Sequence, residues 1–431
     1  MTVTAERRGA LELARISPSG PIDAAVALPG SKSFTHRALI CAALAEGESR
    51  LRGALEAEDT ALTAQALNEL GAAVTFEEGA ARVRGTAGSL APPAGPLHLG
   101  NSGTSIRLLT AVASLCQAAG ETVLDGNEAM RRRPIGELVR ALNELGVAAR
   151  CQEGFPPVVV PAQGLAGGRC ELDASQSSQF ISAILLAAPY ARSDVEVNIR
   201  GTLVSRPYVE MTIQTMADFG VLAEAAGARA FRVACGQRYQ PRDYLVEADA
   251  SGASYFLAAA AATRGRVRVS GLRQGSLQGD MGFLNVLAQM GCQVRREGEA
   301  VEVVGGPLAP LDIDMGKMPD VVPTLAVLAA LAPGVSRIRN IRHLRLKECD
   351  RLRALATELN RCGVRAVEEP AALIIHGGNP HGAEIETYDD HRLAMSFAVL
   401  GLAVEGVAIR NPACVAKSFP DFWERFERLH G

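Results

Sequence analysis

Basic residues stand close to the start of segments that are otherwise apolar and helical in pattern. In PGSKSFTHR, Lys32 and Ser33 open an Ala- and Leu-rich run, and Arg37 follows Ser33 on the same helical face. In GNSGTSIR, Gly103 lets a ligand approach the backbone, and Arg107 lies one turn further on. Capping by Ser or Asn explains the polar residues but not the cations, because a buried cation needs a partner. Helix N-termini favour negative charge, so these segments predict anion-binding sites.

Further segments extend this pattern towards the C-terminus. SQSSQF brings Ser177, Ser178 and Gln179 to another helix start, where hydroxyls and an amide can hold an anion. YDDHR puts Arg392 at the start of a later apolar helix, and AKSFPDF places Lys417 just before the last helix. This repeated placement of donors and cations indicates a protein that binds small anions.

Two other segments combine charges of both signs. In RLKECDR, Lys347 and Arg351 are four residues apart, so on a helix they would repel unless an anion lay between them. Glu348 can pair with Arg351 at the surface, where such a pair is unremarkable. Asp320 in MPDVVP is a carboxylate at a helix start, a position where Asp is usually a cap. For the three arginines of RRRPIGEL, residues 131–133, a solvated loop is the default interpretation.

All of these segments belong to a unit that occurs six times along the chain. Each copy has an apolar helix pattern followed by an amphipathic one that ends in glycine, with the glycines at intervals of 68 to 75 residues. The apolar helix is predicted to be buried, and the second to face solvent on one side. Each glycine is predicted to stop its helix in the left-handed conformation, and a short β-like run follows the first five. The spacing exceeds that of solenoids and favours a compact two-lobed α/β protein with three units per lobe. The apolar patterns start near Ser31, Asn101, Ser175, Ser251, Pro319 and Asp389, and the glycines are Gly71, Gly146, Gly220, Gly291, Gly363 and Gly431.

Bulk composition excludes several classes of protein. The 431 residues carry a net charge of −3, so no global basic field recruits nucleic acid. The nine cysteines form no C-x-x-C pair, which argues against a disulfide framework or a zinc site and fits a reducing cytoplasm. The first residues lack the apolar core of a signal peptide, and no apolar run reaches the roughly 18 residues needed to span a bilayer.

Together, the motifs resemble the 5-enolpyruvylshikimate-3-phosphate synthase family. The resemblance rests on PGSKS, GNSGT, RRRPIG, SSQF, VSRPY, the PD of MPDVV, RLKECDR, YDDHR and AKSFPDF, in the family's order along nearly the whole chain. It implies an inside-out α/β barrel of two lobes, with six repeats of strands plus two helices, three per lobe, and helices buried in each lobe. The lobes are expected at residues 1–29 with 248–431 and at residues 30–247, with the active site in the cleft between them.

The resemblance also implies a reaction and its residues. The family transfers the enolpyruvyl group of phosphoenolpyruvate to the 5-hydroxyl of shikimate 3-phosphate and releases phosphate, without metal or cofactor. By resemblance, Asp320 is the base on the 5-hydroxyl, Glu348 is the proton carrier at the methylene carbon, and Lys32 is a third catalytic residue. The implied shikimate 3-phosphate site comprises Lys32, Ser33, Arg37, Ser177, Ser178, Gln179, Ser205, Tyr208, Asp320 and Lys347. The implied phosphoenolpyruvate site comprises Lys32, Gly103, Arg133, Gln179, Arg351, Arg392 and Lys417.

These inferences set expectations for partners and leave two alternatives open. The two substrates are the expected partners, with no nucleic acid, membrane or cofactor, for a monomer in the cytoplasm. The family is the target of glyphosate, and Gly103 leaves room for that inhibitor. His343 stands where some members carry a substrate-contacting Asn, and Leu108 stands where many carry Pro. One alternative is the enolpyruvyl transferase that uses UDP-N-acetylglucosamine, but its reactive Cys is missing from DGNEAMRRRPIG, and Cys116 fits a core position. The other, a non-enzymatic repeat scaffold, leaves Asp320 and Glu348 unexplained.

Overall fold

The chain folds into two compact units. The structure is a computed structural model that describes residues 3–8, 11–227 and 229–430. Unit 1 comprises Met1–Pro29 and Glu247–Gly431, and unit 2 comprises Gly30–Val246. Unit 2 is therefore inserted into unit 1, and the chain passes between the units twice.

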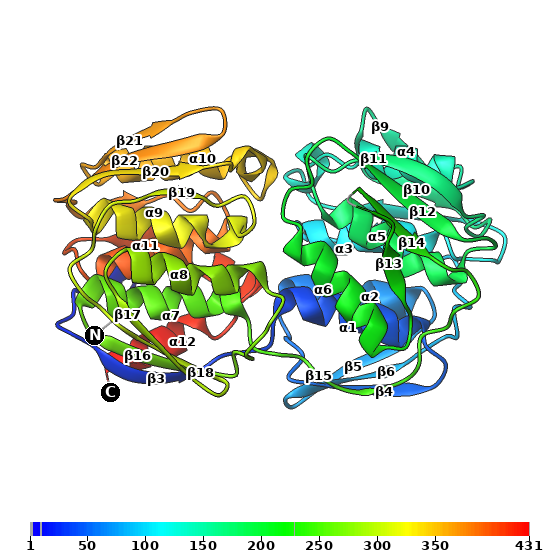
Figure 1. The fold of residues 1–431 in the computed structure, drawn as a ribbon, viewed down its shortest axis with the longest axis horizontal. Coiled ribbons are helices and arrows are strands. Elements are labelled where there is room, and N and C mark those ends of the chain that lie inside the picture. The colour runs from blue at the N-terminus through cyan, green and yellow to red at the C-terminus, as the bar shows by residue number, and fades with distance from the viewer. Residues whose placement is uncertain (1–2, 9–10, 228, 431) are drawn as a thin grey trace. The chain divides into compact units, whose positions relative to one another are not determined.

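The described part of unit 2 contains three four-stranded sheets of one topology (Figure 1). In each sheet one edge strand runs parallel to its neighbour, and the other two pairings are antiparallel. Side chains along the central strands alternate between buried and more exposed, so each sheet turns one face to the core. In sheet order the strands are β15 (Asp243–Leu245), β4 (Glu48–Arg52), β6 (Ala80–Arg84) and β5 (Ala73–Glu77); β7 (Leu97–His98), β8 (Glu121–Asp125), β10 (Phe155–Pro161) and β9 (Arg150–Gln152); and β11 (Gly168–Asp173), β12 (Val195–Arg200), β14 (Ala230–Val233) and β13 (Ala223–Ala225).

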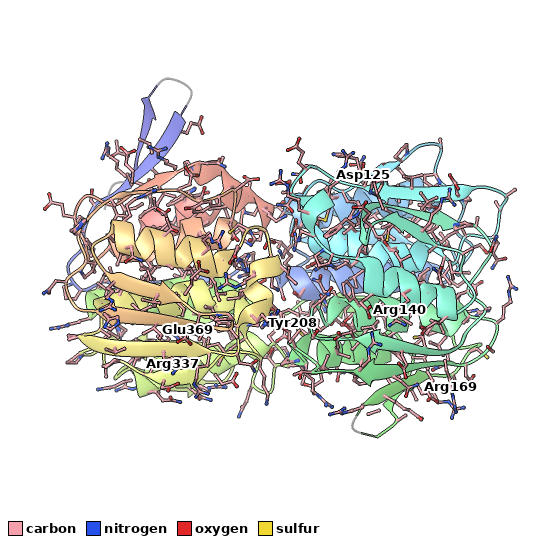
Figure 2. The ribbon with its side chains drawn as sticks, turned by 90° about the horizontal axis from the view of Figure 1, so that it is seen from above. Asp125, Arg140, Arg169, Tyr208, Arg337 and Glu369 are labelled. Carbon is pink, nitrogen blue, oxygen red and sulfur yellow. The ribbon has the colours of Figure 1, made fainter. Side chains whose placement is uncertain are left out.

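Unit 1 repeats this topology in three further sheets within its described residues. Its outward-facing strand positions carry exposed ion pairs, such as Arg337 with Glu369, whose Nη2 and Oε2 are 2.8 Å apart (both labelled in Figure 2). In sheet order the strands are β3 (Asp23–Ala27), β16 (Arg266–Ser270), β18 (Ala300–Val304) and β17 (Gln293–Glu297); β19 (Asp312–Asp314), β20 (Gly334–Arg339), β22 (Ala372–Gly377) and β21 (Arg365–Glu368); and β23 (Glu384–Ile385), β24 (Ala408–Arg410), β2 (Leu11–Ile16) and β1 (Val3–Arg8).

The last sheet of unit 1 is built from both ends of the chain. The sixth repeat contributes β23 and β24, and the hairpin β1–β2 supplies the two strands that the other repeats place after their glycine. Leu13 of β2 lies opposite Arg410 of β24. The pattern of one parallel and two antiparallel pairings is thereby completed in this sheet as well.

Three apolar helices form the centre of each unit, as the repeat pattern predicts (Figure 1). They are rich in Ala, Leu and Val on every side, and almost all their residues are buried, so they pack on one another inside the sheets. The described residues place α1 (Lys32–Leu44), α3 (Gly103–Ala113) and α5 (Gln179–Ala187) in unit 2, and α7 (Ala250–Thr263), α9 (Val322–Leu331) and α11 (His391–Gly401) in unit 1. Cys116 is fully buried in the core of unit 2, as predicted.

The second helix of each repeat is amphipathic, and it packs one face against the core. Each of the first five is followed by a glycine with φ between 76° and 107°, which confirms the predicted left-handed stops. Gly431 lies outside the described residues. These helices are α2 (Glu58–Glu69), α4 (Gly136–Glu144), α6 (Pro207–Asp218), α8 (Phe283–Gln289), α10 (Arg351–Arg361) and α12 (Phe422–Glu427). None of the helices in the described part of the chain is long and apolar enough to cross a membrane.

Candidate functional site

The three buried helices of unit 2 begin side by side. The Thr63 hydroxyl of α2 lies 2.8 Å from His36 Nδ1 of α1 and 2.7 Å from the Ser105 hydroxyl of α3. The Gln179 amide of α5 donates to the Thr104 hydroxyl of α3 at 2.9 Å. Because each helix start carries partial positive charge, their gathering makes this end of unit 2 attractive to anions.

Arg37 is the cation of unit 2 whose surroundings most favour binding of an anion. It is 1% exposed, and its guanidinium donates to the Thr212 hydroxyl (2.7 Å) and to the carbonyls of Ser33 (2.7 Å) and Tyr208 (3.0 Å). Burial lowers its pKa to about 10, which still leaves it charged at neutral pH. All three acceptors are uncharged, and no carboxylate of the described residues forms an ion pair with it. A buried cation with only neutral partners is stabilised by an anionic ligand.

Lys32 stands at the first position of α1, as the sequence predicts. Its ammonium forms an ion pair with Asp59 of α2, with Nζ and Oδ2 2.8 Å apart. Asp59 is buried, so this ion pair restricts the position of the Lys32 ammonium at the start of α1. Ser33 follows at the second position and is half-buried.

Arg133 lies against the start of α3. Its Nη1 donates to the backbone oxygen (3.1 Å) and side-chain oxygen (3.2 Å) of Asn101. A Cβ added at Gly103 would come within 2.4 Å of Arg133 Nη2, so the glycine allows the guanidinium to reach this place. Arg131 and Arg132 are exposed, as the solvated-loop interpretation predicts, but they lie in the 3-10 helix Met130–Arg132. The interpretation is wrong for Arg133, which is buried.

The start of α5 adds hydrogen-bonding groups beside a further cation. Arg107 donates to Gln179 Oε1 at 2.8 Å and stacks over the Phe180 ring, 5.4 Å from its centroid. The Ser177 hydroxyl accepts from the Gln179 backbone N–H at 3.2 Å, and Ser178 is buried. Gln179 thus bridges the starts of α3 and α5.

The segment before α6 has an unusual backbone. Ser205 has φ = 52°, a left-handed conformation that non-glycine residues adopt rarely, and it is buried. Its carbonyl accepts from the Tyr208 backbone N–H at 3.1 Å, and the Tyr208 carbonyl in turn accepts from Arg37 (Tyr208 is labelled in Figure 2). Strain of this kind collects at functional sites. The VSRPY segment therefore supports Arg37 through its backbone.

The buried helices of unit 1 also begin together. The hydroxyls of Ser254 in α7 and Thr324 in α9 are 3.1 Å apart, and those of Thr324 and Ser396 in α11 are 3.4 Å apart. The charged residues of MPDVVP and YDDHR lie at the starts of α9 and α11, and Arg351 of RLKECDR, at the start of α10, contacts Asp320 and Asp390 there. Unit 1 thus repeats the arrangement of unit 2, but with carboxylates among the cations.

Asp320 is surrounded by three cations. Its Oδ2 accepts from Arg392 Nη2 at 2.7 Å, and its Oδ1 lies 3.4 Å from Arg351 Nη1 and 3.7 Å from Lys347 Nζ. Burial alone would raise the pKa of Asp320, but Arg392, Lys347 and Arg351 together hold it well below its ordinary value. The carboxylate is therefore ionised and is the anion that separates Lys347 from Arg351.

Arg351 is the most heavily paired cation of this cluster. It is 1% exposed and donates to Asp390 from Nε (2.7 Å) and Nη2 (3.2 Å) and to Glu348 from Nη2 (2.7 Å). Burial lowers its pKa, but Asp390, Glu348 and Asp320 more than offset this and raise it above the usual arginine value. One guanidinium therefore holds three carboxylates in place.

Two interpretations of RLKECDR are corrected by these contacts. Glu348 and Arg351 do form an ion pair, but their side chains are only 8% and 1% exposed, so the pair is buried and not on the surface. Lys347 and Arg351 do not share a helical face, because residues 347–350 are not helical. Asp350 caps α10 by accepting from the Arg353 N–H at 3.1 Å, and the helix begins at Arg351.

Arg392 and Lys417 complete the cations of unit 1. Arg392 is the second residue of α11, and its Nη1 donates to the Tyr255 hydroxyl at 3.3 Å. The Asp390 carboxylate caps the same helix by accepting from the Arg392 N–H at 2.9 Å. Lys417 ends a short 3-10 helix, Pro412–Lys417, and is buried. Asp390 therefore binds the Arg351 guanidinium and also caps the helix that carries Arg392.

His343 lies in the 3-10 helix Arg342–Leu346, close to Lys347. Its side chain is buried, and its Nε2 has no hydrogen-bond partner among the described residues. Burial and the charge of Lys347 lower its pKa to about 3, with Asp320 acting in the opposite direction. The imidazole is therefore neutral at physiological pH and can offer a hydrogen bond.

Asp280 is a buried carboxyl next to this cluster. It accepts a short hydrogen bond from the Ser251 hydroxyl at the start of α7. Burial raises its pKa to about 7, the Asp320 charge acts in the same direction, and Arg392 acts against both. Near neutral pH the Asp280 carboxyl is therefore protonated in some molecules and ionised in the others.

Replacing Asp280 with asparagine is expected to flatten the pH dependence of stability. The ordinary pKa of the group is 3.8, so it binds its proton more tightly in the folded protein, and its stabilising contribution is complete below about pH 4. That contribution is lost as the pH rises through about 7. The Asp280→Asn variant should therefore gain thermal stability over the wild type at pH 8 and lose this advantage at pH 4. The melting temperatures of both proteins, measured at half-unit pH intervals, test this expectation. A difference in melting temperature that stays constant across the pH range would refute it.

Several residues of these clusters were missed in the sequence. Asp59, Thr212 and Asp280 lie on elements for which the motifs gave no signal. Asp390 is different, because it stands in YDDHR directly before a helix start, where a capping carboxylate could have been inferred. The predicted residues themselves divide between the units, with Lys32 to Tyr208 in unit 2 and Asp320 to Lys417 in unit 1.

The two clusters differ in what they can do chemically. The unit-2 cluster brings together the cations Lys32, Arg37, Arg107 and Arg133, with Asp59 paired to Lys32, so it suits ligands with phosphate or carboxylate groups. The unit-1 cluster interleaves its cations with Asp320, Glu348 and Asp390, so it can hold anions and also move protons. Such a combination is typical of enzymes that act on small anionic substrates.

Comparison with known proteins agrees with this class. The family model for EPSP synthase (3-phosphoshikimate 1-carboxyvinyltransferase) matches residues 16–426. A 3-phosphoshikimate 1-carboxyvinyltransferase from Nostoc punctiforme is 47% identical over 414 residues, which cover 95% of this chain and 97% of the relative. One from Syntrophobacter fumaroxidans is 48% identical over 419 residues, covering 96% and 99%. The chain belongs to the EPSP synthase family.

Solved structures show the same architecture. An EPSP synthase from Acinetobacter baumannii superposes with a TM-score of 0.80 at 28% identity, over 98% of both chains. An enolpyruvyl transferase from Streptomyces tendae reaches a TM-score of 0.77 at 20% identity, over 97% of both chains, and shares the fold. The expected two-lobed α/β fold is confirmed.

Proposed function

We propose that the chain transfers the enolpyruvyl group of phosphoenolpyruvate to the 5-hydroxyl of shikimate 3-phosphate and releases phosphate. One observation carries this proposal: Asp320 and Glu348 are both held by the guanidinium of Arg351, at 3.4 and 2.7 Å, inside a cluster of cations. The reaction needs a base for the hydroxyl, a proton carrier for the methylene carbon, and cations for the phosphates and carboxylates of the substrates. The residues of the two units supply all of these, and we propose that they act on the same pair of substrates.

Shikimate 3-phosphate is assigned mainly to the unit-2 cluster. Arg37 lacks a carboxylate partner among the described residues, and a phosphate fits its remaining donors. The hydroxyls near the starts of α1, α5 and α6 provide neutral donors around it. From unit 1, we assign to this substrate Asp320, Lys347 and, through its neutral imidazole, His343. The residues assigned in unit 2 are Lys32, Ser33, Arg37, Ser177, Ser178, Gln179, Ser205 and Tyr208.

Phosphoenolpyruvate is assigned to cations of both units. In unit 2, Arg133 beside Gly103 presents a guanidinium at a helix start, where an anion gains from the helix dipole. In unit 1, Asp390 binds the guanidinium of Arg351 and caps the helix that carries Arg392. Lys32 and Gln179 contact both substrates in this proposal, and Lys417 completes the set.

The electrostatics of Asp320 suggest how the base is activated. Its pKa is depressed because Arg392, Lys347 and Arg351 face it, and so weak a base removes a hydroxyl proton poorly. Bound phosphate and carboxylate groups would share these cations and raise the pKa of Asp320. Glu348 would protonate the methylene carbon as the 5-hydroxyl adds to the neighbouring carbon. It would then take a proton back from the resulting methyl group as phosphate leaves, which restores the carbon–carbon double bond. Binding of the substrates would thereby prepare Asp320 as the base.

The decisive experiment measures phosphate release from phosphoenolpyruvate with different acceptors and without added metal. Release with shikimate 3-phosphate, but not with UDP-N-acetylglucosamine, is expected. Release only with the sugar nucleotide would favour the sister reaction. Failure with both acceptors in a folded protein would favour a binding scaffold. A single chain is expected to suffice, because residues for every proposed role occur in it, and we propose that it works in the cytoplasm.

Replacing Arg133 with alanine is expected to weaken phosphoenolpyruvate binding. The buried guanidinium sits at the start of α3, and loss of a charge-assisted hydrogen bond typically costs about tenfold or more in affinity. The matched control is Arg132→Ala, since Arg132 is exposed in the same run of arginines. A titration that is unchanged in Arg133→Ala would remove this residue from the site. We expect glyphosate to compete for the same place.

A further inference from the structure

The loop of residues 386–390, between β23 and α11, has a strained backbone. Tyr388 and Asp389 have φ values of 53° and 57°, so two successive non-glycine residues are left-handed. Each such residue is unfavourable, and the conformation persists only where surrounding contacts impose it. The next residue is Asp390, whose carboxylate binds the Arg351 guanidinium and accepts from the backbone N–H of Arg392. The contacts that hold this loop therefore also affect the position of Arg351 and of the helix start that carries Arg392.

Helix α10 holds the loop at two points. At its first residue, Arg351 donates to Asp390. Two turns later, Glu358 is 0% exposed, and its Oε1 accepts from the Tyr388 hydroxyl at 2.8 Å. Residues seven apart share one face of a helix, about 10 Å from each other along the axis. Two residues on one face of the helix, Arg351 and Glu358, thus hold the loop, and only Arg351 is an assigned substrate-binding residue.

The second contact is itself well supported. Glu358 Oε2 accepts from the Glu386 N–H at 3.1 Å and pairs with Arg361 Nη1 at 2.9 Å, so the buried carboxylate is satisfied. Burial and the bond to Glu358 raise the pKa of the Tyr388 hydroxyl, which therefore remains a donor at any pH of interest. On the other side, Asn411 donates to Asp389 Oδ1 at 3.1 Å. The strained turn is thus held from two directions.

We propose that the hydrogen bond between Tyr388 and Glu358 is a positioning device for phosphoenolpyruvate binding. It imposes the left-handed turn, and the turn places Asp390, which binds the guanidinium of Arg351 and caps the helix that carries Arg392. Tyr388 and Glu358 touch no assigned substrate group and act only through Asp390. The inference rests on the proposed function, because the role of the two arginines is assigned there.

The test is the Tyr388→Phe variant, assayed for phosphate release with both substrates varied. The ring of Tyr388 is partly exposed, so phenylalanine fits and only the hydroxyl is lost. We expect the KM for phosphoenolpyruvate to rise about tenfold, the size typical of losing one hydrogen bond to a charged group. The KM for shikimate 3-phosphate should rise less, within about twofold, because most of the residues assigned to it belong to unit 2 and only Asp320, Lys347 and His343 belong to unit 1.

The matched control is Tyr190→Phe in unit 2. Tyr190 also donates a hydrogen bond from its hydroxyl, to the Leu44 carbonyl, and neither Tyr190 nor Leu44 is an assigned residue. It should lose some thermal stability with both KM values unchanged. An unchanged KM for phosphoenolpyruvate in Tyr388→Phe, or an equal rise in both KM values with a lower melting temperature, would overturn the inference. Wild-type protein in the same assay separates this result from failure of the proposed function, which would leave the wild type inactive.

Discussion

Alanine in place of Asp320 is expected to abolish most turnover while the protein stays folded. General base catalysis is typically worth about 10²–10⁴-fold in rate, so a loss of that size in kcat is expected. Asp320 also neutralises Arg392, Arg351 and Lys347, and its removal leaves them free to hold substrate anions more tightly. The expected signature is therefore a much lower kcat with a KM that does not rise. Steady-state phosphate release and a melting curve measure both quantities.

The control for this variant is Asp312→Ala. Asp312 is an exposed carboxylate of β19, paired with Arg339 on the surface of the same unit. Its loss should leave kcat and KM as they are in the wild type. Normal turnover in Asp320→Ala would exclude this carboxylate as the base. A fall in kcat that accompanies loss of the folded state would indicate a structural role only.

Methionine in place of Arg351 is expected to destabilise unit 1 severely. The guanidinium is the shared partner of Asp320, Glu348 and Asp390, and removing it leaves buried carboxylates facing one another. Removal of one partner from a buried ion pair typically costs about 3–5 kcal/mol. We expect a loss of that size in the free energy of unfolding, together with loss of phosphoenolpyruvate binding. Urea unfolding at pH 7.5, followed by circular dichroism, measures the change.

The control is Arg337→Met, in the same unit. Arg337 forms one ion pair, with Glu369, and about half of its side chain is exposed (Figure 2). Exposed pairs of this kind contribute about 0–1 kcal/mol. If the two variants lost similar stability, the three carboxylates would not depend on Arg351. The comparison thus separates the effect of burial on the free energy of unfolding from the effect of having an ion pair at all.

Local pattern was sufficient to predict the helices of this fold. The starts of α1, α3 and α11 at Lys32, Gly103 and His391 follow from polar residues placed before Ala- and Leu-rich runs. The stops follow from glycines, because a left-handed residue ends a helix at little steric cost only when it is glycine. The topology of the sheets could not be predicted, since β2 pairs with a strand at the opposite end of the sequence.

The charged clusters were predicted less completely, and the reason is distance along the chain. Arg351 meets carboxylates 31 and 39 residues away, and no spacing rule connects them. The prediction that Lys347 and Arg351 share a helical face was wrong. Asp350 caps the helix, so α10 begins only at Arg351. The roles of the site residues in substrate binding stay predictions, and the variants above test them one by one.

The sheet shared by β1, β2, β23 and β24 bears on how the chain folds during synthesis. Unit 2 is continuous in sequence, and it can close its core once residue 246 has been made. Strands β1 and β2 by then have left the ribosome, but β24, the partner of β2, does not yet exist. Strand β2 must wait with one edge unpaired until β24, Ala408–Arg410, has been translated, and such an edge is open to wrong pairing. Unit 1 is therefore expected to complete its core last and to be the part of the protein that depends most on chaperones.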